Sequence, residues 1–514
     1  MIQSIIKRDG RVVLYEQSKI AAAILKALEV SGDGDAADAA RVANDVQLEL
    51  EGRFVKESPN IEAIQDSVER QLMNHGFNAA AKAYILYRAN RTRAREANTS
   101  LMKTIDEITN IDARISDMKR DNANIDGNTA MGSMLQIGAA GAKAYNEMYL
   151  LRPEHAKAYR EGDIHIHDFD FYSLTTTCCQ IDILKLFHGG FSTGHGYLRE
   201  PQSIQSYAAL AAIAIQSNQN DQHGGQSIPN FDYAMAEGVA KTYRKAFTRR
   251  LRDIVEDYLD LSDETDVIAK LIADAENATG ETAKLESSPA YTAAVEKLLC
   301  QHYGLQPDMA GRLVDKAAKR SVQKTDRDTK QAMEGFVHNL NTMHSRAGAQ
   351  TPFSSINYGT DVTPEGRMVI RNILLALDAG LGHGETCIFP IHIFKVKEGV
   401  NYNEADPNYD LFRLSMRVSA KRLFPNYTFL DAPYNLQYYV AGRPETEVAT
   451  MGCRTRVFEN RFGEKTSIAR GNLSFSTINI VRLAIECMEI EDKQLRIDRF
   501  FAKLDELLEI TDKQ

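Results

Sequence analysis

The sequence contains no tryptophan, few cysteines and no long apolar run. The lack of tryptophan excludes nothing. Because no stretch approaches the ~18 consecutive apolar residues that a bilayer-spanning helix needs, we predict no membrane segment and no membrane partner. Residues 1–15 carry charges where a signal peptide has its apolar core, so we expect a cytoplasmic protein.

Six cysteines are scattered through 514 residues, which is too sparse for a disulfide framework. No Cys-x-x-Cys pair occurs, so neither a zinc knuckle nor a thioredoxin-like motif is predicted, and we expect no metal site in this sequence. Any thiol chemistry must therefore come from individual side chains. The six are Cys178, Cys179, Cys300, Cys387, Cys453 and Cys487.

The charge and composition are those of an ordinary globular protein. A net charge of −9 argues against bulk binding to nucleic acid, although local basic clusters can still bind small anions. Hydrophobic residues make up 43% and charged residues 25% of the chain, as in soluble proteins. Its length suggests two to four domains.

Residues 1–95 form a separate small α+β domain by their pattern. Two short β-like runs flank Asp9-Gly10, a favourable hairpin turn. A helical spacing of apolar residues follows and ends at Ser31–Gly34. Further helices are predicted to start near Ser58-Pro59 and to cover about 78–97. The pattern predicts a helical bundle with a β-hairpin lid.

The rest of the chain changes character twice. Residues 96–160 read as a helical linker region, and 161–514 alternate short strands, Gly-rich turns and helices, which predicts an α/β domain. Within it, residues 240–335 are highly charged and helical with a polar break at 277–288, and they are interpreted as an insertion or a dimer-forming layer. Residues 492–514 form a helical pattern with no closing turn, so we expect the natural protein to continue.

Four cations surround the predicted hairpin and the following helix start: Lys7, Arg8, Arg11 and Lys19. Phosphates favour such a place, because cations and free backbone N–H groups meet there. A solvated basic turn is the alternative. The motifs KRDGR (7–11), KI (19–20), IQDSVERQL (64–72) and AYILYR (83–88) resemble the ATP-cone, a nucleotide-sensing domain. The resemblance implies that ATP and dATP bind at these cations and at Arg88.

A second resemblance covers most of the remaining chain. The segments IHIHDFDFY (164–172), TTTCCQID (175–182), HNLNTMHSRAGAQTPFSSINYGTD (338–361), GETCIFPIHIFKVKEGVNY (384–402), KRLFPNY (421–427) and MGCRTRV (451–457) resemble the anaerobic ribonucleoside-triphosphate reductase family. The family implies a ten-stranded α/β barrel in which a finger loop carries a radical cysteine. It also implies reduction of ribonucleoside triphosphates to deoxyribonucleoside triphosphates, with ATP activating and dATP inhibiting.

Cys453, in Met-Gly-Cys-Arg-Thr, is the cysteine to which the resemblance assigns the radical. An isolated cysteine is usually a small buried hydrophobe, which is the alternative. A sulfur radical there could take a hydrogen atom from the ribose C3′, so that the 2′ hydroxyl leaves more easily as water. That step needs a proton donor for the 2′ oxygen and an acceptor for the 3′ hydroxyl proton.

The residues near Cys453 in the sequence indicate whether the chain itself supplies the acceptor for the 3′ hydroxyl proton. Oxygen-dependent reductases have a glutamate two residues after the radical cysteine and an asparagine two before it, whereas this chain has Thr455 and Met451. Threonine cannot act as a carboxylate base near neutral pH. Formate, which many family members use, is both a carboxylate and a reductant, so we expect formate. A thioredoxin-like reductant remains open.

Two further pairs are candidates for the site. Cys178 and Cys179 point to opposite faces of a predicted strand, so only one can face the barrel interior. Packing alone is the alternative, and the resemblance favours Cys178 as the second active-site thiol. Asn339 and Asn341 share one face if that segment is extended, where their amides could bind ribose hydroxyls or formate. A capped turn is the alternative.

Two other patterns are weaker. His165 and His167 alternate and Asp168 follows them, a pattern found in metal sites, but no further ligand is apparent at a useful spacing, so structural hydrogen bonding is predicted. The glycines of 380–384 lack the strand-then-helix context and the Lys-Ser/Thr ending of a phosphate loop.

The resemblance also implies parts that are not in these 514 residues. The family stores its radical on a glycine in an R-V-x-G-Y loop beside a four-cysteine zinc site, and a radical-SAM iron–sulfur activase generates it. Gly471 is the last glycine and only Cys487 follows it, so we expect a truncated chain that is inactive as it stands. The family further implies a homodimer or higher oligomer. The alternatives are a catalytically dead nucleotide-binding regulator and another glycyl-radical enzyme, although the latter enzymes lack an ATP-cone.

Overall fold

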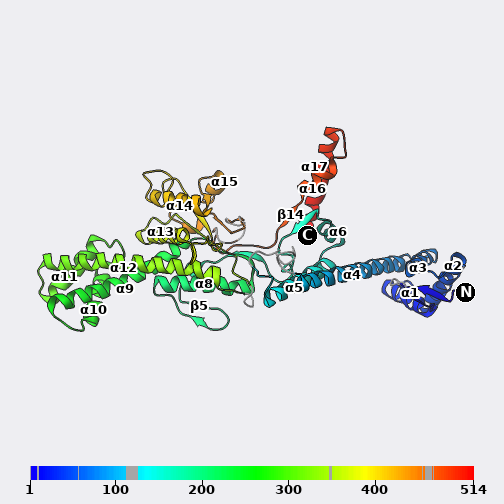
Figure 1. Cartoon of the computed structure of the whole chain (residues 1–514), viewed down its shortest axis with the longest axis horizontal. Coiled ribbons are helices and arrows are strands. Elements are labelled where there is room, and N and C mark those ends of the chain that lie inside the picture. Colours follow the sequence, from blue (N-terminus) through cyan, green and yellow to red (C-terminus); the bar gives the residue numbers. More distant parts are fainter. Residues whose placement is uncertain are drawn as a thin grey trace. The chain divides into compact units, whose positions relative to one another are not determined.

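The computed structural model describes residues 2–7, 11–55, 57–111, 125–345, 350–453, 455–457, 463, 466 and 468–514, with backbone only at 95–99 and 457. The chain divides into two compact units (Figure 1). The first contains Met1–Ile105 and Glu147–Leu150, and the second contains Asp106–Asn146 and Leu151–Gln514.

The first unit is a β-hairpin followed by helices, as the sequence predicts. Strands β1 and β2 pair antiparallel, with Ser4 opposite Leu14. Apolar side chains of the helices form one core that includes Ile24, Val46 and Leu72. The elements are β1 (Ser4–Ile6), β2 (Val12–Leu14), α1 (Gln17–Ser31), α2 (Ala36–Arg53), α3 (Ile61–Asn74) and α4 (Asn78–Asn110).

The helix ends in this unit show where the sequence reading was right and where it was not. Helix α1 ends at Gly32, whose φ of 69° is left-handed, as predicted for the Ser31–Gly34 stop. Helix α3 begins later than Ser58-Pro59, because Asn60 is the residue whose side chain accepts the Ala63 N–H, at 2.8 Å. Helix α2 was not predicted.

The second unit contains a six-stranded sheet in its described residues, with the order β10-β9-β8-β7-β4-β13. The first five strands are parallel and β13 is antiparallel to β4. The α/β class is therefore confirmed, whereas the ten-stranded barrel stays a prediction. The strands are β4 (Thr177–Gln180), β7 (His223–Ile228), β8 (Ser354–Tyr358), β9 (Ile391–Val396), β10 (Asn426–Phe429) and β13 (Gly471–Asn472).

Long helices connect and pack against these strands around the largest apolar core of the chain (Figure 1). Helix α8 begins at Ile204 with Ser203 as its N-cap and is one of the helices that alternate with short strands in this part of the chain. The helices are α8 (Ile204–Asp221), α9 (Phe231–Leu259), α12 (Pro307–Thr342), α13 (Pro364–Ala379) and α14 (Tyr409–Arg422).

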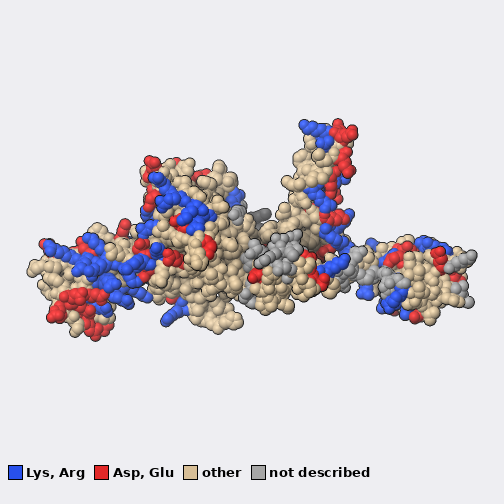
Figure 2. All heavy atoms as spheres, viewed as in Figure 1, with Lys and Arg blue, Asp and Glu red and all other residues tan. Residues whose placement is uncertain are grey.

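The charged section predicted over 240–335 is a helical bundle with its own core. The far halves of α9 and α12 pack with α10 (Thr265–Thr279) and α11 (Pro289–Tyr303) through side chains such as Leu251 and Val295. The polar break lies between α10 and α11, where Ser288 caps α11. Figure 2 shows basic and acidic side chains gathered over this bundle.

The remaining elements are short or lie near the C-terminus. Strands β3 and β14 pair antiparallel, and helix α17 packs on β14 and on α6. None of the helices in the described ranges is both long and apolar enough to cross a membrane. The elements are α5 (Ala130–Tyr145), η2 (Asn146–Leu150), α6 (Pro153–Glu161), β3 (Ile164–Ile166), α7 (Ile183–Phe187), β5 (Phe191–Ser192), β6 (Tyr197–Leu198), α15 (Pro433–Leu436), η3 (Pro444–Thr446), β11 (Ala449–Thr450), β12 (Arg456–Val457), β14 (Ser476–Ile478), α16 (Ile480–Cys487) and α17 (Lys493–Lys513).

The packing of α8 on α9 predicts the effect of a single methyl group. A Cβ at Gly238 would lie 2.8 Å from the ring of the buried Tyr207, so Gly238→Ala is expected to lower the free energy of unfolding by about 1–3 kcal/mol. The control is Gly335→Ala on α12, where a Cβ meets nothing within 4 Å and helix propensity should raise stability by roughly 0.5–1 kcal/mol. Urea denaturation measures both, and equal effects would contradict this packing.

Candidate active site

A hairpin crosses the sheet and carries Cys453 at its turn. Strands β11 and β12 pair antiparallel, with Ala449 opposite Val457. The amide of Asn357, on the central strand β8, donates to the Thr450 carbonyl at 2.9 Å and accepts the Thr450 N–H at 3.0 Å. Ser355, also on β8, accepts the N–H of Gly452 at 3.1 Å. The loop is thus bonded to the sheet up to the residue before Cys453.

This anchoring brings Cys453 to Cys178. Their sulfur atoms lie 3.8 Å apart, although the residues are 275 positions apart in the chain. Cys178 is on β4, is only 2% exposed and has a left-handed φ of 54°, at a shift in the β4–β7 register. The N–H of Gly225 donates to its sulfur at 3.2 Å. Cys453 is half-buried.

Cys179 lies in a different environment. Its sulfur is 3.0 Å from Nδ2 of Asn218 and donates to Oε1 of Gln226 at 3.1 Å. The structure therefore brings together Cys453 and Cys178, the pair favoured in the sequence, while Cys179 bonds to side chains of α8 and β7.

The two thiols differ in acidity. The contact with Cys178, supported by the Thr455 hydroxyl, lowers the pKa of Cys453 below that of an ordinary thiol. The same contact, together with burial, raises the pKa of Cys178. Because two negative sulfur atoms cannot lie in contact, Cys453 becomes the thiolate while Cys178 keeps its proton and donates it towards Cys453.

Two neutral side chains complete the surroundings of Cys453. Thr455 Oγ1 lies 3.2 Å from the Cys453 sulfur, and Asn472 Nδ2 donates to that hydroxyl at 3.4 Å. Asn472 lies on β13, which pairs with the cysteine strand β4. In the described residues the polar side chains within hydrogen-bonding distance of the Cys453 sulfur are a thiol and a hydroxyl. Asn472 was missed in the sequence, where an Asn after Gly471 reads as a turn.

Asn339 and Asn341 do not share a face as the extended reading required. Both lie in the last turn of α12, where residues two apart point in different directions. Asn341 bonds to the segment before β9: its amide donates to the Phe389 carbonyl and accepts the N–H groups of Ile388 and Phe389, each at 3.1 Å. Asn341 therefore holds the segment before β9 in place. Asn339 is half-buried.

A histidine–aspartate cluster borders Cys178. Asp168 Oδ1 lies 2.9 Å from Nε2 of His223 and 3.5 Å from Nε2 of His167, and Asp168 Oδ2 accepts the Thr177 hydroxyl at 2.5 Å. Although burial opposes it, the bonds from His223 and Thr177 hold the pKa of Asp168 below its usual value. The sequence reading missed His223.

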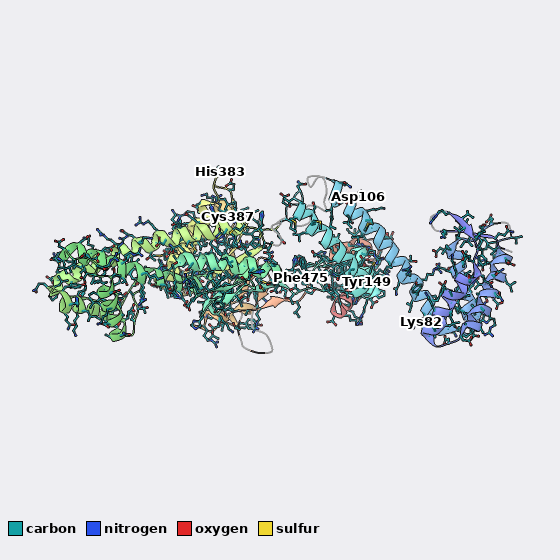
Figure 3. The ribbon with its side chains drawn as sticks, turned by 90° about the horizontal axis from the view of Figure 1, so that it is seen from below. Lys82, Asp106, Tyr149, His383, Cys387 and Phe475 are labelled. Carbon is teal, nitrogen blue, oxygen red and sulfur yellow. The ribbon has the colours of Figure 1, made fainter. Side chains whose placement is uncertain are left out.

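The rings around this cluster are packed rather than open. Phe475, labelled in Figure 3, stacks on His167 with ring centres 4.3 Å apart, and Phe171 stacks on His223 at 3.9 Å. Within the described ranges no group of three His, Cys, Asp or Glu side chains is arranged to bind a metal ion.

The glycine-rich segment 380–384 follows a helix, not a strand. It leaves α13 at Ala379, and Arg422 Nη1 donates to the Gly384 carbonyl at 2.8 Å. His383 is exposed and Cys387 is buried; both are labelled in Figure 3. This context is not that of a phosphate-binding loop.

The predicted nucleotide contacts lie in the first unit. Lys7 and Arg11 are exposed on either side of the hairpin turn, where the Lys7 N–H donates to the Arg11 carbonyl at 2.8 Å. Lys19 is exposed and pairs with Glu16 at 2.8 Å. Arg8 lies outside the described residues. Arg88 makes ion pairs of 2.5–2.8 Å with three α3 carboxylates, those of Glu62, Asp66 and Glu69. An anion at Arg88 would have to displace one of them.

Sequence comparisons place the chain in a family. The sequence model of the anaerobic ribonucleoside-triphosphate reductases (NRDD) matches residues 121–514, and that of the ATP cone domain matches residues 3–93. The chain belongs to the anaerobic ribonucleoside-triphosphate reductase family, as its motifs predicted.

Individual proteins are similar to much of the chain. The anaerobic ribonucleoside-triphosphate reductase of Salmonella typhimurium is 27% identical over 518 residues, covering 100% of this chain and 62% of the relative. That of Escherichia coli is 27% identical over 491 residues, covering 95% of this chain and 59% of the relative. A crystal structure of the anaerobic ribonucleotide reductase from Thermotoga maritima aligns with a TM-score of 0.42 at 12% identity, covering 82% of this chain and 60% of that one. The chain thus spans about 60% of the length of these relatives.

The acidity of Cys453 can be measured by alkylation, because only the thiolate reacts. Because its pKa is lowered, Cys453 should react with iodoacetamide at pH 7 nearly as fast as at pH 9. An ordinary thiol, with a pKa of about 8.5, reacts much more slowly at pH 7 than at pH 9. Cys178→Ala removes the donor, so the midpoint of the Cys453 profile should move up by about one pH unit or more. Peptide mass spectrometry gives the rate at each cysteine.

Cys179→Ala is the matched control, since Cys179 bonds to Asn218 and Gln226 and should leave the Cys453 profile in place. An unchanged midpoint in Cys178→Ala would show that the contact does not set the acidity of Cys453.

Proposed function

We propose that this chain carries the active site of a reductase that converts ribonucleoside triphosphates to deoxyribonucleoside triphosphates through a thiyl radical on Cys453. The observation that carries the proposal is the 3.8 Å contact between the sulfur atoms of Cys453 and Cys178. A loop bonded to the sheet holds one thiol, and a bulged strand holds the other. Such a pair can deliver a hydrogen atom and a proton to the same sugar.

The two thiols suit two different tasks. The sulfur radical at Cys453 takes the hydrogen atom from C3′ of the ribose and later returns it. Cys178, which stays protonated because its pKa is raised, donates a proton to the 2′ hydroxyl as that group leaves as water. The radical itself would come from a glycyl radical, which the family resemblance implies. As the Cys453 thiolate gives up one electron, a proton must reach the glycine with it, so that the glycine C–H bond forms again.

The reductant is proposed to be formate. Thr455 and Asn472 are neutral, so neither can take the 3′ hydroxyl proton as a carboxylate would. Formate beside them would supply the carboxylate and two electrons. The overall reaction balances as ribonucleotide, formate and one proton giving deoxyribonucleotide, carbon dioxide and water.

The organisation of the protein is proposed as follows. Residues 1–95 would be the ATP-cone, 96–160 a helical linker region and 161–514 the catalytic domain. The sheet of five parallel strands would be one half of the ten-stranded barrel, with the hairpin of Cys453 as the finger loop inside it. The glycyl radical, its zinc site, a radical-SAM activase and a homodimer or higher oligomer are expected of the complete protein.

The ATP-cone is proposed to bind ATP and dATP and to regulate the reductase. The exposed cations Lys7, Arg11 and Lys19 lie on the hairpin and the following helix start, and Arg8 belongs to the same cluster by sequence. Asn341 is proposed to act indirectly, by holding Ile388 and Phe389 in place. Arg88 would join the nucleotide only by exchanging a carboxylate for a phosphate.

The catalytic assignment predicts the effect of Cys453→Ser. In the protein activated without oxygen, this change should abolish deoxynucleotide formation and leave the glycyl radical doublet in the electron spin resonance spectrum, because a hydroxyl does not form the needed radical. Labelled formate should be released as carbon dioxide in a one-to-one ratio with product in the unchanged protein.

Cys179→Ser is the control and should retain turnover. Product formation by Cys453→Ser would refute the role of Cys453. A doublet without any turnover in the unchanged protein would favour the alternative, a nucleotide-binding regulator.

The nucleotide assignment predicts that Lys7→Ala and Arg11→Ala each weaken dATP binding by about tenfold, because each loses one cation–phosphate contact. Isothermal titration calorimetry measures the dissociation constant. Lys82→Ala is the control. Lys82, labelled in Figure 3, is near the start of α4. The neighbouring Ala80 N–H bonds to Asp33, beyond the end of α1 opposite to Lys19. Equal affinity in all four proteins would remove these cations from the site.

A further inference from the structure

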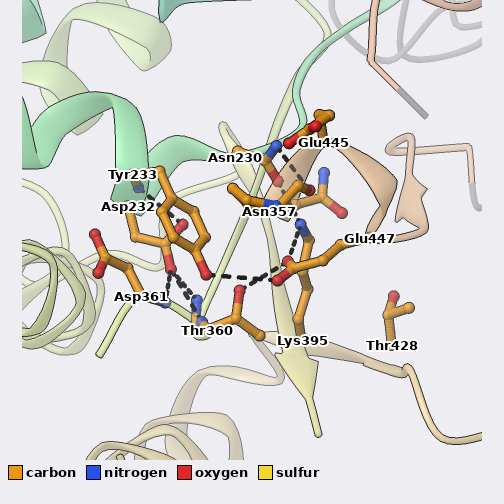
Figure 4. A network of polar contacts seen from close by, with 12 residues as sticks. Asn230, Asp232, Tyr233, Asn357, Thr360, Asp361, Lys395, Thr428, Glu445 and Glu447 are labelled. Carbon is orange, nitrogen blue, oxygen red and sulfur yellow. Dashed lines mark hydrogen bonds and ion pairs between the residues drawn. The ribbon is translucent and has the colours of Figure 1, made fainter. Parts of the chain in front are cut away.

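A buried ion pair lies at the base of the loop that carries Cys453, and the proposed chemistry does not use it. Lys395 on β9 is fully buried, and its Nζ lies 2.9 Å from Oε2 of Glu447, whose side chain is 5% exposed. Lys395 Nζ also donates to Oδ1 of Asn230 at 2.6 Å (Figure 4). Both residues belong to the second unit, and Glu447 stands just before β11.

Glu447 is held by neutral donors as well. The Thr360 hydroxyl donates to Oε2 at 2.8 Å, and the Tyr233 hydroxyl donates to Oε1 at 3.5 Å. The backbone at Thr360 is itself fixed, because Oδ2 of Asp232 accepts its N–H at 3.0 Å and those of both neighbouring residues (Figure 4). The carboxylate of Glu447 therefore meets a rigid set of donors from β9, α9 and the segment after β8.

Stability alone does not explain such a pair. Removing two charges from water costs more than a single buried contact usually returns, and an apolar pair of equal volume is often as stable. The energy of a hydrogen-bonded ion pair depends on the direction of its bonds, whereas that of an apolar contact does not. The donors around Glu447 are therefore satisfied in one arrangement only. Lys395 and Glu447 therefore specify where the loop begins along the sheet.

That starting point determines where Cys453 lies, because Cys453 follows Glu447 by six residues, through strand β11 and the turn that comes after it. A slip of one residue would move the segment by roughly 3.3 Å and turn its side chains to the other face. The contact of 3.8 Å between Cys453 and Cys178 could not survive such a slip.

We propose that Lys395 and Glu447 are positioning residues that set the register of the Cys453 loop against the sheet and thereby hold Cys453 beside Cys178. The proposal rests on the proposed function only for the importance of Cys453. The positioning itself is a property of the chain and can be measured without turnover.

The test compares disulfide formation between Cys178 and Cys453 in four proteins under diamide, with the crosslinked peptides quantified by mass spectrometry. They are the unchanged chain, Lys395→Met, the double variant Lys395→Met/Glu447→Gln, and Lys397→Met. Lys397→Met is the matched control, because Lys397 follows the same strand and loses an ion pair of 2.6 Å with Asp431, whose other hydrogen bond is to the N–H of Glu398 in the part of the chain that the structure describes. Circular dichroism melting identifies which variants are folded.

The double variant separates positioning from folding, since it leaves no unpaired buried charge. Crosslinking should slow by about tenfold or more in both Lys395→Met and the double variant, because small displacements of reacting atoms cost large factors in rate. The alkylation midpoint of Cys453 should move to higher pH in the same variants, as it loses contact with Cys178. Lys397→Met should match the unchanged chain in both measurements.

A folded double variant that crosslinks at the unchanged rate would overturn the proposal. So would loss of folding in both Lys395 variants beside a folded Lys397→Met, because the pair would then support the whole domain instead of the loop. Slow crosslinking together with no deoxynucleotide formation by the unchanged, activated protein would leave the positioning intact and refute only the proposed function.

Discussion

The pairing of the Asn357 amide with both backbone groups of Thr450 is the interaction on which the site depends. A chain segment that crosses a sheet away from water must satisfy its N–H and C=O groups, and those of Thr450 bond to a side chain instead of to a neighbouring strand. Asn357 acts in place of that strand, at 2.9 and 3.0 Å. Together with the bond from the Gly452 N–H to Ser355, it holds the loop against β8.

This role explains the unusual composition of the central strands. Parallel strands covered on both faces are usually continuous apolar runs. Strand β8 is fully buried, yet it contains Ser354, Ser355 and Asn357, and two of these three bond to the Cys453 loop. The polar residues are thus hydrogen-bonding partners of a distant segment. The interior is specified by hydrogen bonds as much as by apolar packing.

Local patterns in the sequence predicted the parts of the fold that depend on near neighbours. The β-hairpin, the end of α1 at Gly32 and the α/β alternation follow from turn residues and periodicity. Local patterns could not predict the direction in which the Asn341 side chain points or the residue to which Asp168 bonds. Asn341 bonds to Phe389 and Asp168 to His223, which are 48 and 55 positions away, and no local spacing encodes such pairs.

The burial of Lys395 could not be predicted from its local sequence either. In a strand read as IHIFKV, lysine at an alternate position is expected to face solvent, but all six residues of β9 are buried. Its counter-ion Glu447 is 52 residues further along the chain. The motifs could identify the family and the two cysteines, because those are properties of short segments. They could not identify the residues that hold the segments together.

The backbone at Cys178 has one more consequence. Gly224, with φ of 78°, faces the cysteine so closely that a Cβ there would lie 2.9 Å from the Cys178 sulfur and 2.8 Å from its backbone nitrogen. The Cys178 thiol therefore occupies space that is open because Gly224, on the neighbouring strand β7, has no side chain. Even alanine would clash at position 224. A sequence with any other residue there would have to place its second thiol at a different position in the fold.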